Sequence, residues 1–304
     1  MQNENLPQKE NIAEVLKKYK EASGNTPNET KNPVLGTSIP KPTPFNQSDY
    51  ERAMSKETDP DLMTSYEIVK LPSNGLFYSH GISEVNVEYM TSRDEDLLTT
   101  PSLIESGTVL DLLLKRKIKT HGIVVEDLLA GDRNAIILFL RTSSYGADYT
   151  VQVPDPRTNI PFTTKVDLTK LRYKEMTEMP DERGYFTVDL PMRKKIATIR
   201  ILTSGEDTKI YKKAEAIKDA YNEDFSQYST LKLKASIVAI NEKTDRSYID
   251  RFVDAMPALD AFSIRKRLMD VSPDVDMEYE FMAKDGYTFK ANLSVGIDFF
   301  FPQI

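Results

Sequence analysis

Side chains able to carry out catalysis are few in this sequence and stand apart. The chain has no cysteine and two histidines, His80 and His121. The lack of cysteine excludes disulfides, thiolate nucleophiles and most structural zinc sites. A Ser-His-Asp triad or a histidine metal site needs a histidine held by a second polar partner. Neither histidine has such a pattern around it, so we expect surface or turn histidines, no metal and no cofactor.

Two acidic runs could suggest acid-base or metal chemistry. They are "RDEDLL" from Arg93 and "SGEDTK" from Ser204, and each closely follows a threonine, Thr91 or Thr203. Carboxylates in a first helical turn complement the helix dipole and cap free N–H groups. We therefore predict two capped helix starts in place of a catalytic pair.

The tetrad "GDRN", Gly131 to Asn134, is the nearest approach to a catalytic motif. We expect Asp132 to be a helix N-cap and Arg133 to donate a buried or interface ion pair, because "DR" returns at Asp245 without the flanking glycine or asparagine. The sequence contains no glycine-rich phosphate loop and no calcium-loop pattern. No enzymatic activity is predicted.

The charge balance argues against nucleic acid and membrane as partners. The net charge is −7, and basic clusters occur at 115–119, 193–195 and 265–267. Without interleaved exposed aromatic residues, such clusters are typical of helix ends. No apolar run approaches the roughly 20 residues of a membrane span, and no signal-peptide pattern opens the chain. We expect a protein made in the cytosol, with no small-molecule substrate.

Alternating apolar and polar residues predict several hairpins. The stretches 65–72 and 83–90 alternate on either side of "LPSNGLFYSHG", so Leu76, Phe77 and Tyr78 are expected to begin a returning strand with at least one side chain inward. Helices are predicted from about 92, over 109–118 and over 132–141. A second hairpin is predicted over 148–168 and a closing one over 276–293, with its turn at Asp285-Gly286.

Much of this order recurs at a nearly constant offset. Thr91 and Thr203 are 112 positions apart, and "DRNAIILF" and "DRSYIDRF" are 113 apart. We predict an α+β fold with two similar hairpin-helices-hairpin lobes, 61–175 and 176–304, arising by internal duplication. Chance similarity of short segments is the alternative.

Residues 1–60 are rich in proline and polar residues, which favours an extended N-terminal arm. "IPKPTPF" is typical of polyproline II. One short helix is predicted, with Ile12, Val15, Leu16 and Tyr19 on one face. It could pack on its own body or on a neighbouring subunit.

Aromatic residues cluster at the first bend and at the chain end, where three phenylalanines are consecutive. A strand uses consecutive aromatics when both of its faces are covered, either by its own helices or by another protein. We therefore expect the partner-binding residues to be Ile12, Val15, Leu16, Tyr19, Phe45, Leu76, Phe77, Tyr78, Phe299, Phe300 and Phe301.

Four motifs in order carry a family resemblance: "LPSNGLFY", "MTSRDEDLL", "GDR" and "RTSSYG". With the terminal "DFFFP", they make residues 66–302 similar to the baseplate proteins of T4-type contractile-tailed phages, which include the hub or hub-assembly component. The family's members often carry cysteine pairs in the hairpin regions. Here 148–168 and 276–293 have none, so no metal role is carried over.

The resemblance implies a structural subunit of the virion tail, assembled in the host cytoplasm. It would link hub or tube to wedge proteins, with self-association in a symmetric ring as a further option. The alternative is an assembly factor absent from the mature virion. A cell-wall hydrolase is disfavoured because glycosidase chemistry needs two carboxylates flanking a sugar cleft.

Overall fold

The computed structural model describes residues 65–78, 81–174, 176–221, 225–283 and 285–301. Contacts divide the chain into residues 1–59 and residues 60–304. Every described residue belongs to the second unit. Ile12, Val15, Leu16, Tyr19 and Phe45 lie outside the described residues.

The described chain mixes helices with small antiparallel sheets, so the predicted α+β class is confirmed. In the first half the elements are β1 (Tyr66–Lys70), β2 (Glu84–Glu88), α3 (Ser92–Leu98), α4 (Pro101–Glu105), α5 (Val109–Lys117), η2 (Val125–Asp127), α6 (Ala130–Tyr145), β3 (Asp148–Pro154), β4 (Pro161–Asp167) and η3 (Leu168–Lys170).

The second half continues the same mixture and ends in a short 3-10 turn. Its elements are β5 (Arg172–Tyr173), β6 (Tyr185–Leu190), β7 (Lys195–Arg200), α7 (Ser204–Tyr221), α8 (Tyr228–Ser236), β8 (Ile237–Ile240), α9 (Arg246–Asp254), α10 (Ala258–Val271), β9 (Val275–Asp276), β10 (Glu278–Met282), β11 (Thr288–Asn292) and η4 (Ile297–Phe300).

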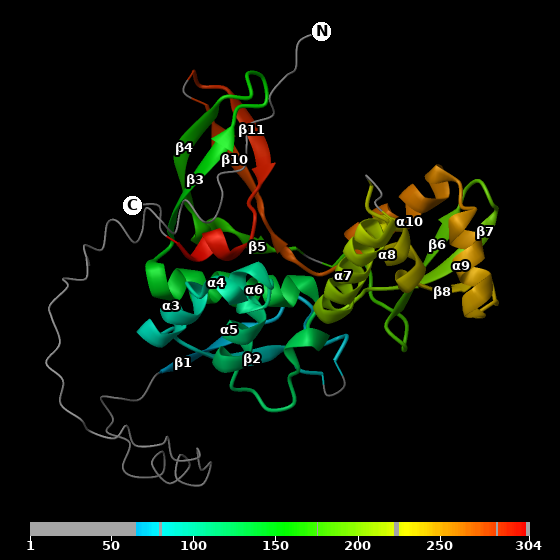
Figure 1. The fold of residues 1–304 in the computed structure, drawn as a ribbon, viewed down its shortest axis with the longest axis horizontal. Helices are drawn as coiled ribbons and strands as arrows, with labels where there is room; N and C mark the ends of the chain where they lie inside the picture. Colours follow the sequence, from blue (N-terminus) through cyan, green and yellow to red (C-terminus); the bar gives the residue numbers. More distant parts are fainter. Residues whose placement is uncertain (1–64, 79–80, 175, 222–224, 284, 302–304) are drawn as a thin grey trace, which may run out of the picture. The chain divides into compact units, whose positions relative to one another are not determined.

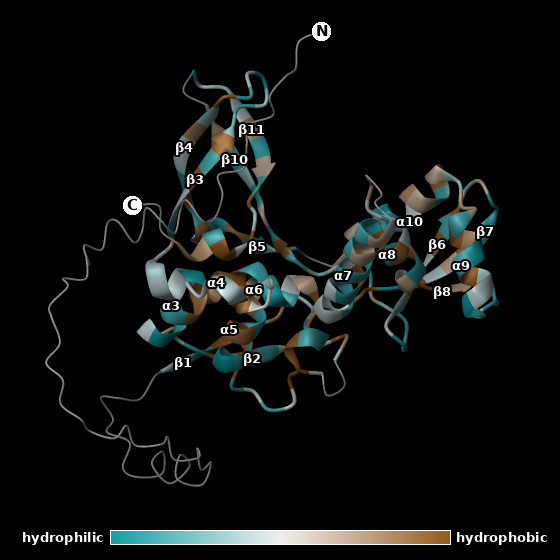
Figure 2. Cartoon of the chain, viewed as in Figure 1, coloured by the Kyte–Doolittle hydropathy of each residue, from teal (hydrophilic) through white to brown (hydrophobic). Residues whose placement is uncertain are grey.

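Two apolar cores stabilise these elements. The first core is built from β1 to β4, α3, α5 and α6, and the second from β6 to β8 with α8 to α10. Apolar stretches of α5 and α6 are brown in Figure 2, and buried leucines and isoleucines of these helices lie in the first core.

The C-terminal segment returns to the first core. Phe281, Leu293, Phe299 and Phe300 pack there, although the sequence predicts a lobe boundary at residue 175. The cause is contact between hairpins: β10–β11 (orange to red in Figure 1) lies beside β3–β4 (green), and the rings of Phe162 and Phe289 are 6.2 Å apart. The cores therefore do not divide at that boundary.

The three hairpins named from the sequence all form, because β1 pairs with β2, β3 with β4 and β10 with β11, each antiparallel. β6 and β7 form a further antiparallel pair. One detail is wrong: Leu76, Phe77 and Tyr78 lie in turns, and the returning strand begins only at Glu84. Asn74 and Gly75 both adopt positive φ there, which extends the bend beyond a simple reversal.

The repeated order is visible in the strand pairing as well. β2 forms a bridge from Val87 to Ile118, just after α5, and β7 pairs Ile199 with Ile237, just after α8. Val87 and Ile199 are 112 positions apart, the same offset as the two capping threonines. This agreement supports the duplication, which stays a prediction.

Candidate functional site

The two sides of the loop between β1 and β2 are in direct backbone contact. The Leu71 N–H donates to the Ser83 carbonyl at 2.8 Å. Gly75 has φ of 76°, and a Cβ added there would lie 2.6 Å from the carbonyl carbon of Gly81. Only glycine allows this approach, so the loop has a fixed shape.

The three apolar side chains of this loop have different environments. Leu76 is 40% exposed. Phe77 is half-buried, and its ring centroid lies 6.3 Å from that of Phe186 in β6, within the second core. Tyr78 is half-buried against the first core. The loop thus contacts both cores and leaves Leu76 at the surface.

Tyr78 and Asp132 join the two most distinctive motifs. The Tyr78 hydroxyl donates to the Asp132 carboxylate, the Ser73 N–H donates to the same carboxylate at 2.9 Å, and the Leu129 N–H donates to the Tyr78 oxygen at 3.0 Å. The expectation that Asp132 is an N-cap is wrong, because α6 begins at Ala130 and Leu129 holds the cap position. Asp132 instead anchors the loop.

Burial governs the electrostatics of this pair. It raises the pKa of the Asp132 carboxyl, although hydrogen bonds from Tyr78 and Ser73 act in the opposite direction. Burial, followed by the nearby Asp132 charge, also raises the pKa of Tyr78. Because the Asp132 side chain is fully buried, a substrate has no access to it in this conformation. The contacts fit a structural anchor.

Gly131 and Asn134 of "GDRN" pack against residues 273–274, which follow α10. A Cβ on Gly131 would lie 2.1 Å from the Pro273 carbonyl oxygen, so α6 and residues 273–274 touch backbone to backbone. The Asn134 side-chain amide donates to the Asp274 carboxylate at 3.1 Å.

Arg133 pairs with Asp111 of α5 at 2.9 Å, with both side chains half-buried, so its predicted ion pair is confirmed. Its counterpart Arg246 pairs with Asp250 at 2.8 Å. The contacts of this tetrad are therefore structural.

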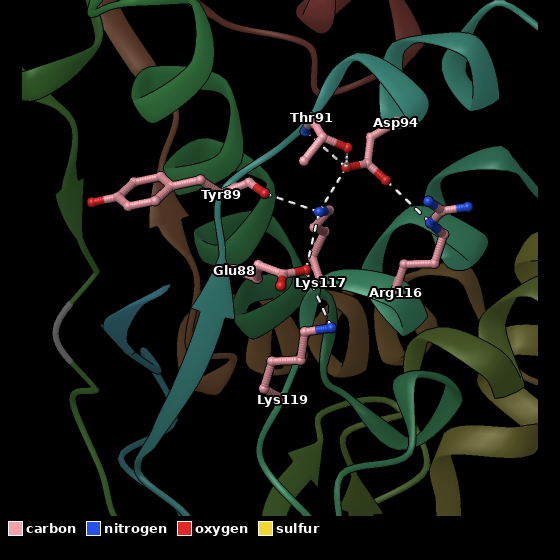
Figure 3. A network of polar contacts seen from close by, with 7 residues as sticks. All are labelled: Glu88, Tyr89, Thr91, Asp94, Arg116, Lys117 and Lys119. Carbon is pink, nitrogen blue, oxygen red and sulfur yellow. Dashed lines mark hydrogen bonds and ion pairs between the residues drawn. The ribbon is translucent and has the colours of Figure 1, made fainter. Parts of the chain in front are cut away.

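A second polar cluster surrounds Lys117, at the end of α5 (Figure 3). This lysine is only 3% exposed. Its Nζ lies 2.6 Å from the Asp94 carboxylate and 3.2 Å from that of Glu88, and it donates to the Tyr89 carbonyl at 2.9 Å. Such a buried cation requires this compensation, because removing it from water is costly.

The cations around Lys117 are paired as well. Arg116 pairs with Asp94, Lys119 with Glu88 and Lys115 with Glu126. Burial acts to raise the pKa of Asp94, but hydrogen bonds from Lys117 and Thr91 outweigh it, and the net pKa is lowered. Asp94 also closes the predicted capping box of α3 with Thr91. Every cation of the cluster 115–119 thus has a carboxylate partner within the chain, and Asp94 and Glu88 each serve two cations.

Phe299 and Phe300, two of the three consecutive phenylalanines, lie inside the protein. Phe299 and Phe300 are 0% exposed in the first core, and Phe301 is half-buried against it. The Nε of buried Arg141 donates to the Phe299 carbonyl at 2.7 Å, which ties the chain end to α6. This corrects the expectation that Phe299 and Phe300 are available to a partner, because the protein's own helices and hairpins cover both.

The two histidines are the remaining candidate residues. His121 is exposed, and His80 lies outside the described residues. Within the ranges that the structure describes, no group of His, Asp and Glu side chains has metal-site geometry. No helix in the same part of the chain has the length and apolarity to span a membrane.

The sequence was compared with protein families, curated proteins and solved structures. Residues 63–300 match the family described as "T4 bacteriophage base plate protein", so the chain belongs to that family. The comparisons with curated proteins and with solved structures gave no significant match.

Family membership makes this chain a phage baseplate protein, a component of the virion tail whose partners are other baseplate proteins.

Proposed function

We propose that this protein is a non-enzymatic structural subunit that links the hub or tube of a contractile-tail baseplate to the surrounding subunits. The family match over residues 63–300 carries the proposal. The described polar clusters support it, because Tyr78, Asp132, Lys117 and Asp94 bond to one another or to the chain's own backbone.

Leu76 is the contact residue that the described structure favours. Its loop is fixed by the Gly75 approach and by Tyr78, so an exposed apolar side chain is held in place before any partner arrives. Preorganisation lowers the entropic cost of binding. Phe77 packs against the second core and Tyr78 against the first, so both anchor the loop. The arm residues Ile12, Val15, Leu16, Tyr19 and Phe45 are proposed as further contacts, together with self-association in a ring.

Two variants test the linking role. The variant Leu76→Asp should fold as the wild type does but enter tails about tenfold less, the equivalent of roughly 1.4 kcal/mol. Deleting residues 1–60 should also reduce incorporation. Ile196→Asp, at a residue with similar exposure, is the matched control. Incorporation of both variants at the wild-type level would contradict the proposal.

Mass spectrometry of purified mature tails decides between a resident subunit and an assembly factor. A resident subunit has a fixed copy number in the tail, and we expect that result. If the chain is present in assembly intermediates and absent from mature tails, it is an assembly factor and the structural proposal fails.

A further inference from the structure

Helix α10 has a second apolar face, opposite the one that packs in the core. Its buried residues are Asp260, Ala261, Ile264 and Val271. The Asp260 carboxylate accepts hydrogen bonds from the Met192 and Arg193 N–H groups. On the exposed side, Leu259, Phe262 and Met269 are 51%, 55% and 65% exposed. Residues 259, 262, 266 and 269 recur at intervals of three and four, which places them on one stripe of the helix. We call residues 259, 262, 265, 266 and 269 the outer face of α10.

This outer face is cationic on an acidic protein. Arg265 and Lys266 form no ion pair within the part of the chain that the structure describes, whereas their neighbour Arg267 pairs with Glu178 and donates to the Thr187 carbonyl. The chain carries a net charge of −7, so the outer face has the opposite sign to the whole. The usual role of cations at a helix end does not explain why Arg265 and Lys266 stand among three exposed apolar side chains.

A groove lies along one edge of this face. It runs between α8 and α10, has a volume of about 380 Å³ and is lined by Tyr228, Leu233, Arg265, Leu268 and Met269 among others. Leu233, Leu268 and Met269 supply the apolar lining. Arg265 belongs to both the groove and the outer face. A groove of this kind accommodates apolar side chains of an approaching segment.

We infer that the outer face of α10 and this groove bind an acidic segment of another baseplate protein, one whose apolar side chains enter the groove and whose carboxylates meet Arg265 and Lys266. The inference rests on the proposed function. Charge complementarity selects the occupant, because oppositely charged patches steer association and exclude wrong partners.

The same charges disfavour the other occupants. A second copy docking about a two-fold axis would bring the outer face against itself and place Arg265 and Lys266 opposite like charges. An anionic membrane would be repelled by the net charge of −7.

Charge reversal is the first test. Arg265→Glu with Lys266→Glu should lower incorporation into tails at least about tenfold, roughly 1.4 kcal/mol, while Arg265→Lys with Lys266→Arg retains it. Both variants should keep the wild-type melting temperature, because the side chains are exposed. Wild-type incorporation of the charge-reversed chain would overturn the inference.

Crosslinking identifies the occupant directly. A photo-crosslinking amino acid replaces Phe262 in the full chain, tails are assembled and irradiated, and crosslinked peptides are sequenced by mass spectrometry. We expect a peptide from a different baseplate protein with net negative charge. A second copy of this chain, its own residues 1–64, a basic peptide or no crosslink would each overturn the inference. The same label at Ile196 is the matched control.

A vesicle assay covers the membrane alternative. The full chain is mixed with vesicles of phosphatidylglycerol and phosphatidylcholine and sedimented. We expect the chain to stay in the supernatant, and co-sedimentation that charge reversal abolishes would overturn the inference.

The two proposals fail separately. If the wild-type chain is missing from mature tails, the structural role fails, and crosslinking of assembly intermediates still decides the occupant. If the wild-type chain is present at a fixed copy number but the Phe262 crosslink is absent, only the present inference fails.

Discussion

The Tyr78 hydroxyl donates a hydrogen bond to the Asp132 carboxylate across 54 positions of the chain. This bond joins the "LPSNGLFY" loop to the first turn of α6, and Leu129 and Ser73 complete it through their N–H groups. The loop in turn places Phe77 against the second core. The pair formed by half-buried Tyr78 and buried Asp132 therefore fixes the loop that exposes Leu76.

Removing the Tyr78 hydroxyl should destabilise the protein. Tyr78→Phe leaves the Leu129 N–H without its acceptor and the buried Asp132 carboxylate with one donor fewer. We expect the free energy of unfolding to fall by about 1–3 kcal/mol, measured by urea denaturation. Tyr66→Phe is the control, because Tyr66 is exposed, and it should change stability by less than about 0.5 kcal/mol. Equal effects of the two variants would contradict the anchoring role.

Asp132 should also give the protein a recognisable pH dependence. Because burial raises its folded pKa above the unfolded value, the folded state binds the proton more tightly. The stability from this group is fully present below the unfolded pKa, near 4, and is lost as pH rises through the folded pKa.

Asp132→Asn isolates this contribution. Urea denaturation of the two proteins from pH 4 to pH 8 should show wild type losing stability relative to Asp132→Asn as pH rises. A constant difference across this range would show that Asp132 does not titrate as inferred.

Local patterns were sufficient to predict the hairpins and the starts of α3 and α7, but not the start of α6. Side-chain alternation identifies β1 with β2, and the spacing of Thr91 and Asp94 identifies the start of α3, because both signals lie within a few residues. The anchoring role of Asp132 was missed, since the donors at Ser73 and Tyr78 come from a loop distant in sequence. N-cap preference alone could not reveal them.

Local sequence patterns also could not show which parts of the chain cover the apolar residues. Three consecutive phenylalanines indicate that another part of a protein covers them. Only the fold shows that the first core does so for Phe299 and Phe300, with the Tyr149 ring 5.0 Å from that of Phe299. The outer face of α10 had a signal in the sequence, the spacing of Leu259, Phe262 and Met269. No helix is predicted from the sequence over residues 258–271, so this spacing was not recognised as one face of a helix.

Lys117 should be the most costly lysine of its cluster to remove. Lys117→Met leaves the buried Asp94 carboxylate with Arg116 as its remaining cation and removes the donor to the Tyr89 carbonyl. We expect a loss of about 3 kcal/mol in unfolding free energy, measured by urea denaturation at pH 7.

Lys119→Met is the matched control for Lys117. Lys119 also pairs with Glu88, but its side chain is half exposed, and exposed pairs contribute about 0–1 kcal/mol. The double variant Lys117→Met with Asp94→Asn should recover part of the loss, because no uncompensated carboxylate then stays buried. A double variant no more stable than Lys117→Met would contradict this reading.

Gly131 should tolerate no side chain. An added Cβ would lie 2.1 Å from the Pro273 oxygen and 2.5 Å from the Asp274 Cα, so α6 would have to move away from the returning chain and strain the Asn134 bond to Asp274. We expect Gly131→Ala to cost about 1–3 kcal/mol, as overpacking of a core does, although alanine has the better helix propensity.

Gly296→Ala is the control for Gly131. Gly296 has φ of −134°, an ordinary extended value, and an added Cβ meets nothing within 4 Å. The unfolding free energy of the Gly296→Ala variant should stay within about 0.5 kcal/mol of the wild-type value. If Gly131→Ala were equally harmless, α6 and residues 273–274 would not be in backbone contact, and the path by which the chain returns to the first core would have to be redrawn. Thermal unfolding of both variants decides the point.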